Sequence, residues 1–74
     1  MDFDYRKLLG KMREMNISQA SLAKQIGLSE SQFNRKLKGV YCFTQDEIFK
    51  MCEALDIRPN EIDLYFFTLK VEKN

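Results

Sequence analysis

The sequence predicts an all-α domain, and three observations support this class. Apolar residues recur at helical spacing over most of the 74 residues, the chain has a single proline, and no two strand-like runs are joined by a two-residue turn signal. A chain of this length forms one domain and buries only about 60% of the surface that its unfolded form exposes. We therefore expect several short helices around one compact core.

Five short patterns predict where these helices begin. In each, an apolar residue precedes the N-cap position and another apolar residue follows at the fourth helical position, which is typical of a hydrophobic staple. Ser29 with Gln32 and Thr44 with Glu47 complete capping boxes, and Pro59 suits a first helical position after Arg58. The other two starts are at Asp4 and Ser18. The predicted helices span residues 5–15, 19–26, 30–38, 45–55 and 59–66.

Two apolar stripes of these helices are assigned to the core. The first helix contributes Tyr5, Leu8, Leu9 and Met12, and the fourth contributes Ile48, Met51, Cys52 and Leu55. Residues 1–66 then form one domain, and residues 67–74 form a C-terminal tail.

Composition argues against several classes of function. The chain has no His, which removes the commonest general base, and so small a helical domain has little room for a catalytic pocket. Two cysteines without His argue against a zinc site, and we expect no cofactor, metal or small-molecule ligand. The lack of His and of room for a pocket therefore predicts a protein that is not an enzyme. No signal peptide or membrane-spanning run is apparent, so we expect a cytoplasmic protein.

Charge is distributed unevenly along the chain. Residues 1–41 carry eight Lys or Arg and four Asp or Glu, whereas residues 42–74 carry four Lys or Arg and seven Asp or Glu. The net charge of +1 is therefore the sum of +4 in the first part and −3 in the second. The basic half is the candidate for contact with nucleic acid. Ordinary solvated faces are the alternative explanation.

Within the basic half, Gly27 separates two short helical runs. Leu22, Ala23 and Ile26 form the inner face of the first, and a glycine directly after it is suited to a left-handed helix end. The next helix restarts at the Ser29 cap and leaves at a steep angle. This pattern predicts a helix-turn-helix.

The extended pattern resembles the lambda-repressor-like or Cro-type helix-turn-helix regulators of the XRE group. The residues that carry the resemblance are Ile17-Ser18-Gln19, Leu22-Ala23, Ile26-Gly27, Ser29, Phe33, Gly39, Glu47-Ile48, Leu55-Asp56-Ile57 and Glu61-Ile62. The downstream part looks like small prophage repressor or Cro-like proteins of Gram-positive bacteria. The resemblance implies a five-helix DNA-binding domain whose second and third helices form the helix-turn-helix. It departs from the family pattern at Lys36, where an apolar residue is usual.

The residues that face DNA follow from the helical rotation of the third helix. Phe33 and Leu37 point into the core, so Arg35 points away, with Ser31 close to it. In the family's docking mode this helix enters the major groove, and we expect base contacts from Ser31, Arg35, Gln32 and Glu30. Gln32 has an equal claim to the Ser29 capping box, Glu30 is favoured at a helix start without any ligand, and Arg35 could pair with a helix neighbour.

Phosphate contacts are expected around this helix. The resemblance implies that Gln19, at the start of the second helix, binds a phosphate. The remaining phosphate candidates are Asn34, Lys36, Lys38, Tyr41 and Thr44. For Thr44, plain helix capping is an equal alternative.

The predicted function is sequence-specific binding of a double-stranded DNA operator by a Cro-like or repressor-like transcriptional regulator. The alternative is a protein-interaction module with the same fold, such as an antitoxin, antirepressor or adaptor. We also predict a homodimer formed through the tail, with Tyr65, Phe67, Leu69 and Val71 as contacts, because these residues exceed what the core needs. Alternatively, Leu69 and Val71 fold back on the first helix.

Overall fold

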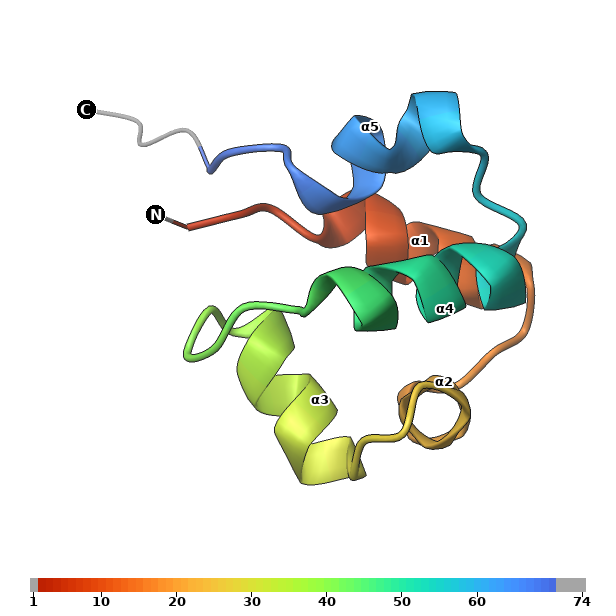
Figure 1. The fold of residues 1–74 in the computed structure, drawn as a ribbon, viewed down its shortest axis with the longest axis vertical. Coiled ribbons are helices and arrows are strands. Elements are labelled where there is room, and N and C mark those ends of the chain that lie inside the picture. The colour runs from red at the N-terminus through yellow and green to blue at the C-terminus, as the bar shows by residue number, and fades with distance from the viewer. Residues whose placement is uncertain (1, 71–74) are drawn as a thin grey trace.

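The computed structural model describes residues 2–70, which form five α-helices and one short 3₁₀ turn (Figure 1). The elements are α1 (Arg6–Glu14), α2 (Gln19–Gln25), α3 (Glu30–Leu37), α4 (Gln45–Leu55), η1 (Pro59–Glu61) and α5 (Ile62–Phe66). The all-α class and the five predicted helices are confirmed, although the fifth begins as the tighter η1 turn. No helix within residues 2–70 has the length and apolar character needed to cross a membrane.

Three helix starts have the side-chain caps that the sequence predicts. In each, a hydroxyl oxygen accepts a hydrogen bond of 3.1 Å from the backbone N–H three residues later; the caps are Ser18, Ser29 and Thr44. The prediction for α1 was wrong by one position, because Tyr5 is its N-cap and makes no side-chain cap. Asp4 instead accepts a hydrogen bond of 2.9 Å from the Arg6 backbone N–H and pairs with its guanidinium.

Gly27 makes the sharp turn between α2 and α3. Its φ of +83° lies in the left-handed region, where a side chain would be strained. The Leu28 backbone N–H then donates to the Ala23 carbonyl at 2.8 Å, which satisfies one carbonyl at the end of α2. In Figure 1, α2 is seen end-on while α3 lies across the view, so the two helices meet at a steep angle.

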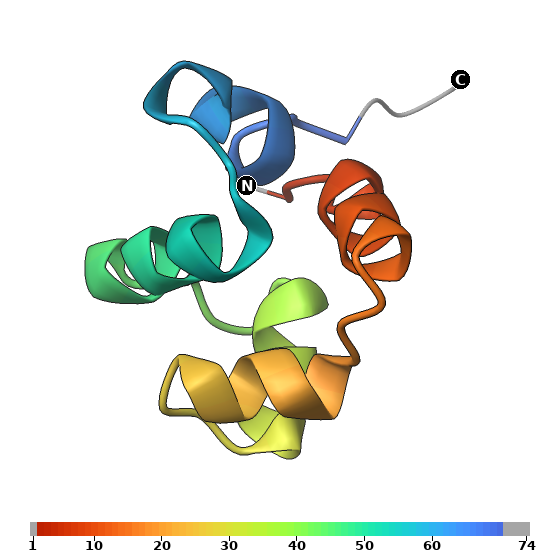
Figure 2. The same ribbon diagram turned by 90° about the vertical axis from the view of Figure 1, so that its right-hand side faces the viewer.

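All five helices contribute to one core (Figure 2). The fully buried large side chains are Leu8, Leu22, Phe33, Met51, Leu55 and Phe66. Phe43, in the segment before α4, joins these parts together. Its ring centroid lies 5.5 Å from Tyr5, 5.7 Å from Phe33 and 6.4 Å from Phe66. Because Phe33 is the buried residue of α3, this aromatic cluster fixes the rotation of α3 about its own axis.

The two ends of the described chain lie side by side (Figure 1). Phe3 and Leu69 form an antiparallel bridge, flanked by hydrogen bonds from the Asp4 N–H to the Thr68 carbonyl at 2.6 Å and from the Lys70 N–H to the Asp2 carbonyl at 3.0 Å. Residues 67–70 of the expected tail thus pack against the segment that precedes α1. This arrangement is close to the fold-back alternative.

Candidate nucleic-acid interface

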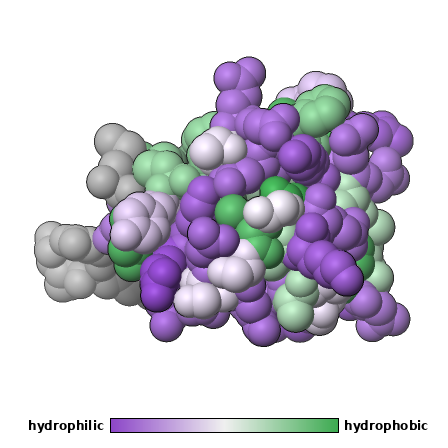
Figure 3. Space-filling view, turned by 60° about the horizontal axis from the view of Figure 1, so that its bottom comes forward, coloured by the Kyte–Doolittle hydropathy of each residue, from purple (hydrophilic) through white to green (hydrophobic). Residues whose placement is uncertain are grey.

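One side of α3 presents exposed polar side chains. Phe33 is buried and Leu37 is half-buried on the inner side, whereas Ser31, Arg35 and Lys38 are exposed on the outer side, as the helical rotation predicts. Together with Glu30 and Asn34 they line a shallow hollow along the helix. We call these five residues the α3 face. Figure 3 shows the side of the molecule that carries α2 and α3, and hydrophilic residues cover most of it.

The cations of the α3 face are available to a ligand. Within residues 2–70, neither Arg35 nor Lys38 takes part in an ion pair. Arg35 also lines a second hollow, between α3 and the loop before α4, which includes Gln32 and Tyr41. Tyr41 is 60% exposed. The structure therefore brings the predicted residues Arg35, Gln32 and Tyr41 to one continuous surface.

Gln19 connects the start of α2 to α3. Its Oε1 accepts a hydrogen bond of 3.4 Å from the Asn34 Nδ2, and both residues are half-buried. This contact orients the Gln19 side chain toward the α3 face while its backbone N–H, at the first position of α2, has no helical partner. Gln19 and Asn34, both predicted phosphate contacts, therefore lie next to each other.

Gln32 and Thr44 both take part in the capping boxes that were the alternative to a DNA contact. The Gln32 Oε1 accepts a hydrogen bond of 2.9 Å from the Ser29 backbone N–H, and the two residues form a complete capping box. Thr44 forms the same kind of box with Glu47. Both side chains are therefore engaged in holding a helix start. Among the hydrogen bonds of residues 2–70, the side-chain amide nitrogen of Gln32 donates none.

Lys36 differs from the expectation of a phosphate contact. Its Nζ donates to the Glu47 Oε1 at 2.6 Å, and both side chains are only 13% exposed. Burial raises the pKa of Glu47, but the hydrogen bonds from Lys36 and from the Thr44 backbone outweigh it and leave that pKa below its ordinary value. Lys36 thus joins α3 to the start of α4 through an ion pair. The sequence signal for this pair was the departure at Lys36 itself.

The predicted dimer contacts occupy different environments. Tyr65 is half-buried against the core, Leu69 bridges to Phe3, and Phe67 packs edge-on against the Phe3 ring with 5.9 Å between centroids. Phe67 and Leu69 are nevertheless about half exposed, at 52% and 47%. Val71 lies outside the described residues.

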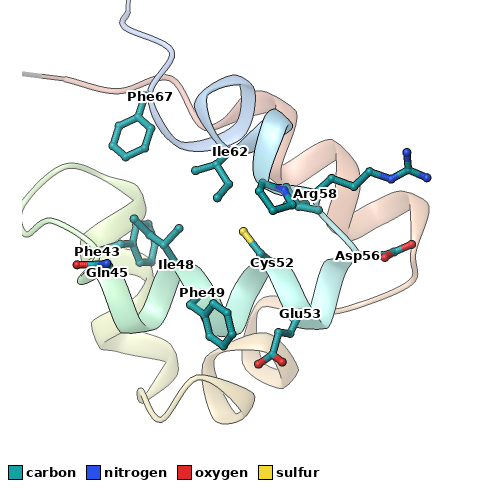
Figure 4. A pocket seen from close by; sticks show the side chains of 12 residues that line it. Phe43, Gln45, Ile48, Phe49, Cys52, Glu53, Asp56, Arg58, Ile62 and Phe67 are labelled. Carbon is teal, nitrogen blue, oxygen red and sulfur yellow. The ribbon is translucent and has the colours of Figure 1, made fainter.

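Sequence reasoning missed an apolar groove between α4 and the η1–α5 segment (Figure 4). Its volume is about 790 Å³, and its walls include Ile48, Cys52 and Ile62, with Phe49 at 60% exposure on its edge. The signal was present in α4, where Phe49 falls outside the apolar stripe that faces the core.

Comparison with known proteins gives a family model and similar solved structures. A family model described as "Protein of unknown function (DUF739)" matches residues 1–69. The chain is 39% identical to the modulator of repression (MOR) of the temperate bacteriophage TP901-1 from Lactococcus lactis, whose solution structure it matches with a TM-score of 0.76 over 97% of each chain. No curated protein matches the chain by sequence.

Proposed function

The chain belongs to the DUF739 family, and we propose that it is a phage regulatory protein that binds duplex DNA by inserting α3 into the major groove. The observation that carries this proposal is the α3 face, where Ser31, Arg35 and Lys38 project from a helix whose opposite side is held in the core by Phe33. The similarity to a phage modulator of repression supports a regulatory role.

Each residue of the α3 face has a role in this proposal. The guanidinium of Arg35 is suited to a bidentate hydrogen bond with guanine O6 and N7, and Ser31 is suited to a neighbouring base edge. Lys38, Asn34 and Gln19 are suited to the phosphates on either side of the groove. Glu30 is exposed at the first position of α3, where it interacts favourably with the helix dipole; cytosine N4 is its one suitable base partner. We leave Lys36 out of the DNA contacts because of its ion pair with Glu47.

Selection of binding sites from a random duplex pool tests this function. The wild-type chain should enrich one sequence motif, and Arg35→Ala should lose the preference at one base position while its circular dichroism spectrum stays unchanged. Arg13→Ala removes the same charge from an exposed site on α1 and should keep the full motif. A pool without enrichment, or an Arg35→Ala profile identical to the wild type, would contradict the proposal.

A homodimer is part of the same proposal, because two-fold operators are bound by two-fold proteins. The half-exposed Leu69 supports a contact at the paired chain ends. Leu69→Ser should shift sedimentation from dimer to folded monomer and weaken operator binding. An unchanged dimer would move the interface elsewhere.

The second candidate function is a protein-interaction module. It is favoured by the apolar groove between α4 and η1–α5, which lies among the acidic residues of the second half of the chain. Absence of any duplex binding at low salt, together with a stable complex formed with another protein, would favour this candidate.

A further inference from the structure

The groove between α4 and the η1–α5 segment, which we call the α4–α5 groove, is an apolar surface with two half-exposed aromatic rings. Phe49 and Phe67, at 60% and 52% exposure, both line it. In Figure 4, the side chains of Ile48 and Cys52 project from α4, and that of Ile62 projects from α5, toward the space between the two helices. Exposed aromatic rings beside an apolar groove are typical of a surface that another molecule covers.

The charges around this groove are mainly negative. Residues 45–66 carry six Asp or Glu against two Lys or Arg. Glu53 and Asp56 are exposed on the groove wall, and within residues 2–70 neither takes part in an ion pair. Arg58 is the cation among the lining residues. A ligand with positive charge beside an apolar surface would match this pattern.

Among residues 2–70, the groove offers few backbone partners to an extended chain. Its longest wall is α4, whose backbone groups are largely paired within the helix, and the β-bridge described here joins Phe3 to Leu69 at the chain ends. An occupant that enters an apolar groove must therefore satisfy its own backbone N–H and C=O groups. A helix does so, and its apolar side chains at positions i, i+3, i+4 and i+7 would lie on the groove floor.

We propose that the α4–α5 groove binds an amphipathic helix of another protein, with an apolar stripe flanked by Lys and Arg. A helix of about three turns matches the length of α4. Its apolar stripe would cover Phe49 and Phe67, and its basic flanks would lie near Glu53 and Asp56.

Other occupants fit these observations less well. A second copy would bring two net-negative rims together, and the phosphates of DNA would meet the same acids. A small molecule buries most of its own surface in a site that is largely enclosed, whereas this groove leaves both aromatic rings about half exposed. The groove and the α3 face have no lining residue in common, so one chain can hold a partner helix and DNA together.

Three synthetic peptides of about four helical turns test the proposal without any DNA. The first has a Leu stripe flanked by Lys, the second has Glu in place of every Lys, and the third has the same composition as the first with the stripe dispersed. Binding to the full chain is measured by fluorescence anisotropy at several salt concentrations, and the contacted residues are mapped by amide chemical shifts. Because no DNA is present, failure here is separate from failure of the proposed function.

Only the first peptide should bind, with shift changes confined to the α4–α5 groove. Phe49→Ala should weaken this binding by about tenfold, whereas Leu64→Ala, an exposed residue outside the groove lining, should leave it unchanged. The double variant Glu53→Gln, Asp56→Asn should weaken it by about threefold and reduce its salt dependence. Both sets of changes are on exposed side chains, and thermal melting checks that each variant is folded.

Several results would overturn the proposal. These are no binding of the first peptide up to millimolar concentration, equal binding of the second or third, an unaltered affinity in Phe49→Ala, or shift changes on the α3 face. Sedimentation of the full chain as a dimer that Phe49→Ala dissociates would assign the groove to a second copy instead.

Discussion

The α3 face and the α4–α5 groove are two surfaces on one small core, and they differ in charge and in apolar exposure. Residues 19–41, which include α3, carry four Lys or Arg and one acid, whereas residues 45–66 carry two and six. The buried large residue of α3 is Phe33, but α4 has apolar residues on two sides, with Met51 inside and Phe49 outside. In a chain this short, an exposed apolar residue that the core does not need therefore indicates a binding surface as clearly as an exposed charged residue does.

The largest expected effect comes from comparing two phenylalanines, one in each region. Phe33→Ala removes a fully buried ring from the centre of the core and should destabilise the fold by about 3 to 5 kcal/mol. Phe49→Ala removes a ring that is 60% exposed and should change stability by less than about 0.5 kcal/mol. Urea unfolding followed by circular dichroism measures both. Similar losses in the two variants would mean that the α4–α5 groove is part of the core.

Arg35→Lys tests how the α3 face recognises a base pair. The substitution keeps the charge and removes the planar guanidinium. Discrimination at one base pair should fall by about 1 to 3 kcal/mol because Lys cannot make the bidentate contact. The salt dependence of binding should stay the same, since the number of cations is unchanged. Competition between the selected duplex and single-base variants measures the loss. Retained discrimination would assign Arg35 to a phosphate.

The Lys36–Glu47 pair joins α3, which carries the first surface, to α4, which carries part of the second. Glu47→Gln keeps an oxygen for the Thr44 capping box but loses the ion pair, and it should lower stability at neutral pH by about 1 to 2 kcal/mol. In the folded wild-type chain the pKa of Glu47 is lowered from an ordinary value of 4.5. The stability that Glu47 contributes is therefore complete above that pH and is lost as pH falls through the folded pKa.

The difference between wild type and Glu47→Gln should therefore shrink as the pH falls below about 4.5. Denaturant unfolding at a series of pH values measures it. A difference that stays constant with pH would show that Glu47 contributes through its shape and not through its charge.

The weakest of these substitutions lies in α1 and changes neither surface. A Cβ added at Gly10 in α1 would meet nothing within 4 Å, so Gly10→Ala should stabilise the fold by about 0.5 to 1 kcal/mol through the backbone entropy of the unfolded chain. Gly27→Ala is the matched control, because a φ of +83° should make it destabilising by about 1 kcal/mol. Thermal melting distinguishes the two. A destabilising Gly10→Ala would indicate a close contact at α1.

Local patterns predicted the fold well because short-range chemistry decides helix starts and turns. The boxes at Ser29 and Thr44 and the left-handed Gly27 each depend on residues within a few positions of one another. The helical rotation of α3 likewise predicted that Arg35 and Ser31 lie outside and Phe33 inside. This prediction required only which side of α3 faces the core.

Contacts between distant residues were not predictable in the same way. The Lys36–Glu47 pair and the Phe3–Leu69 bridge depend on how whole elements pack, and no local pattern states which partners will meet. The α4–α5 groove needed the position of α5 relative to α4. In the sequence, only Phe49 indicated this groove, because it is an apolar residue of α4 outside the stripe that faces the core.

We expect the α3 face to bind duplex DNA, and a salt titration of duplex binding is the decisive experiment. The logarithm of the binding constant should fall linearly with the logarithm of salt concentration, and Lys38→Ala should reduce that slope by about one unit. Amide shifts in the complex should change at residues 30–38 and at Gln19. Affinity that does not change with salt, or shift changes confined to α4 and α5, would show that the α3 face does not bind DNA in this way.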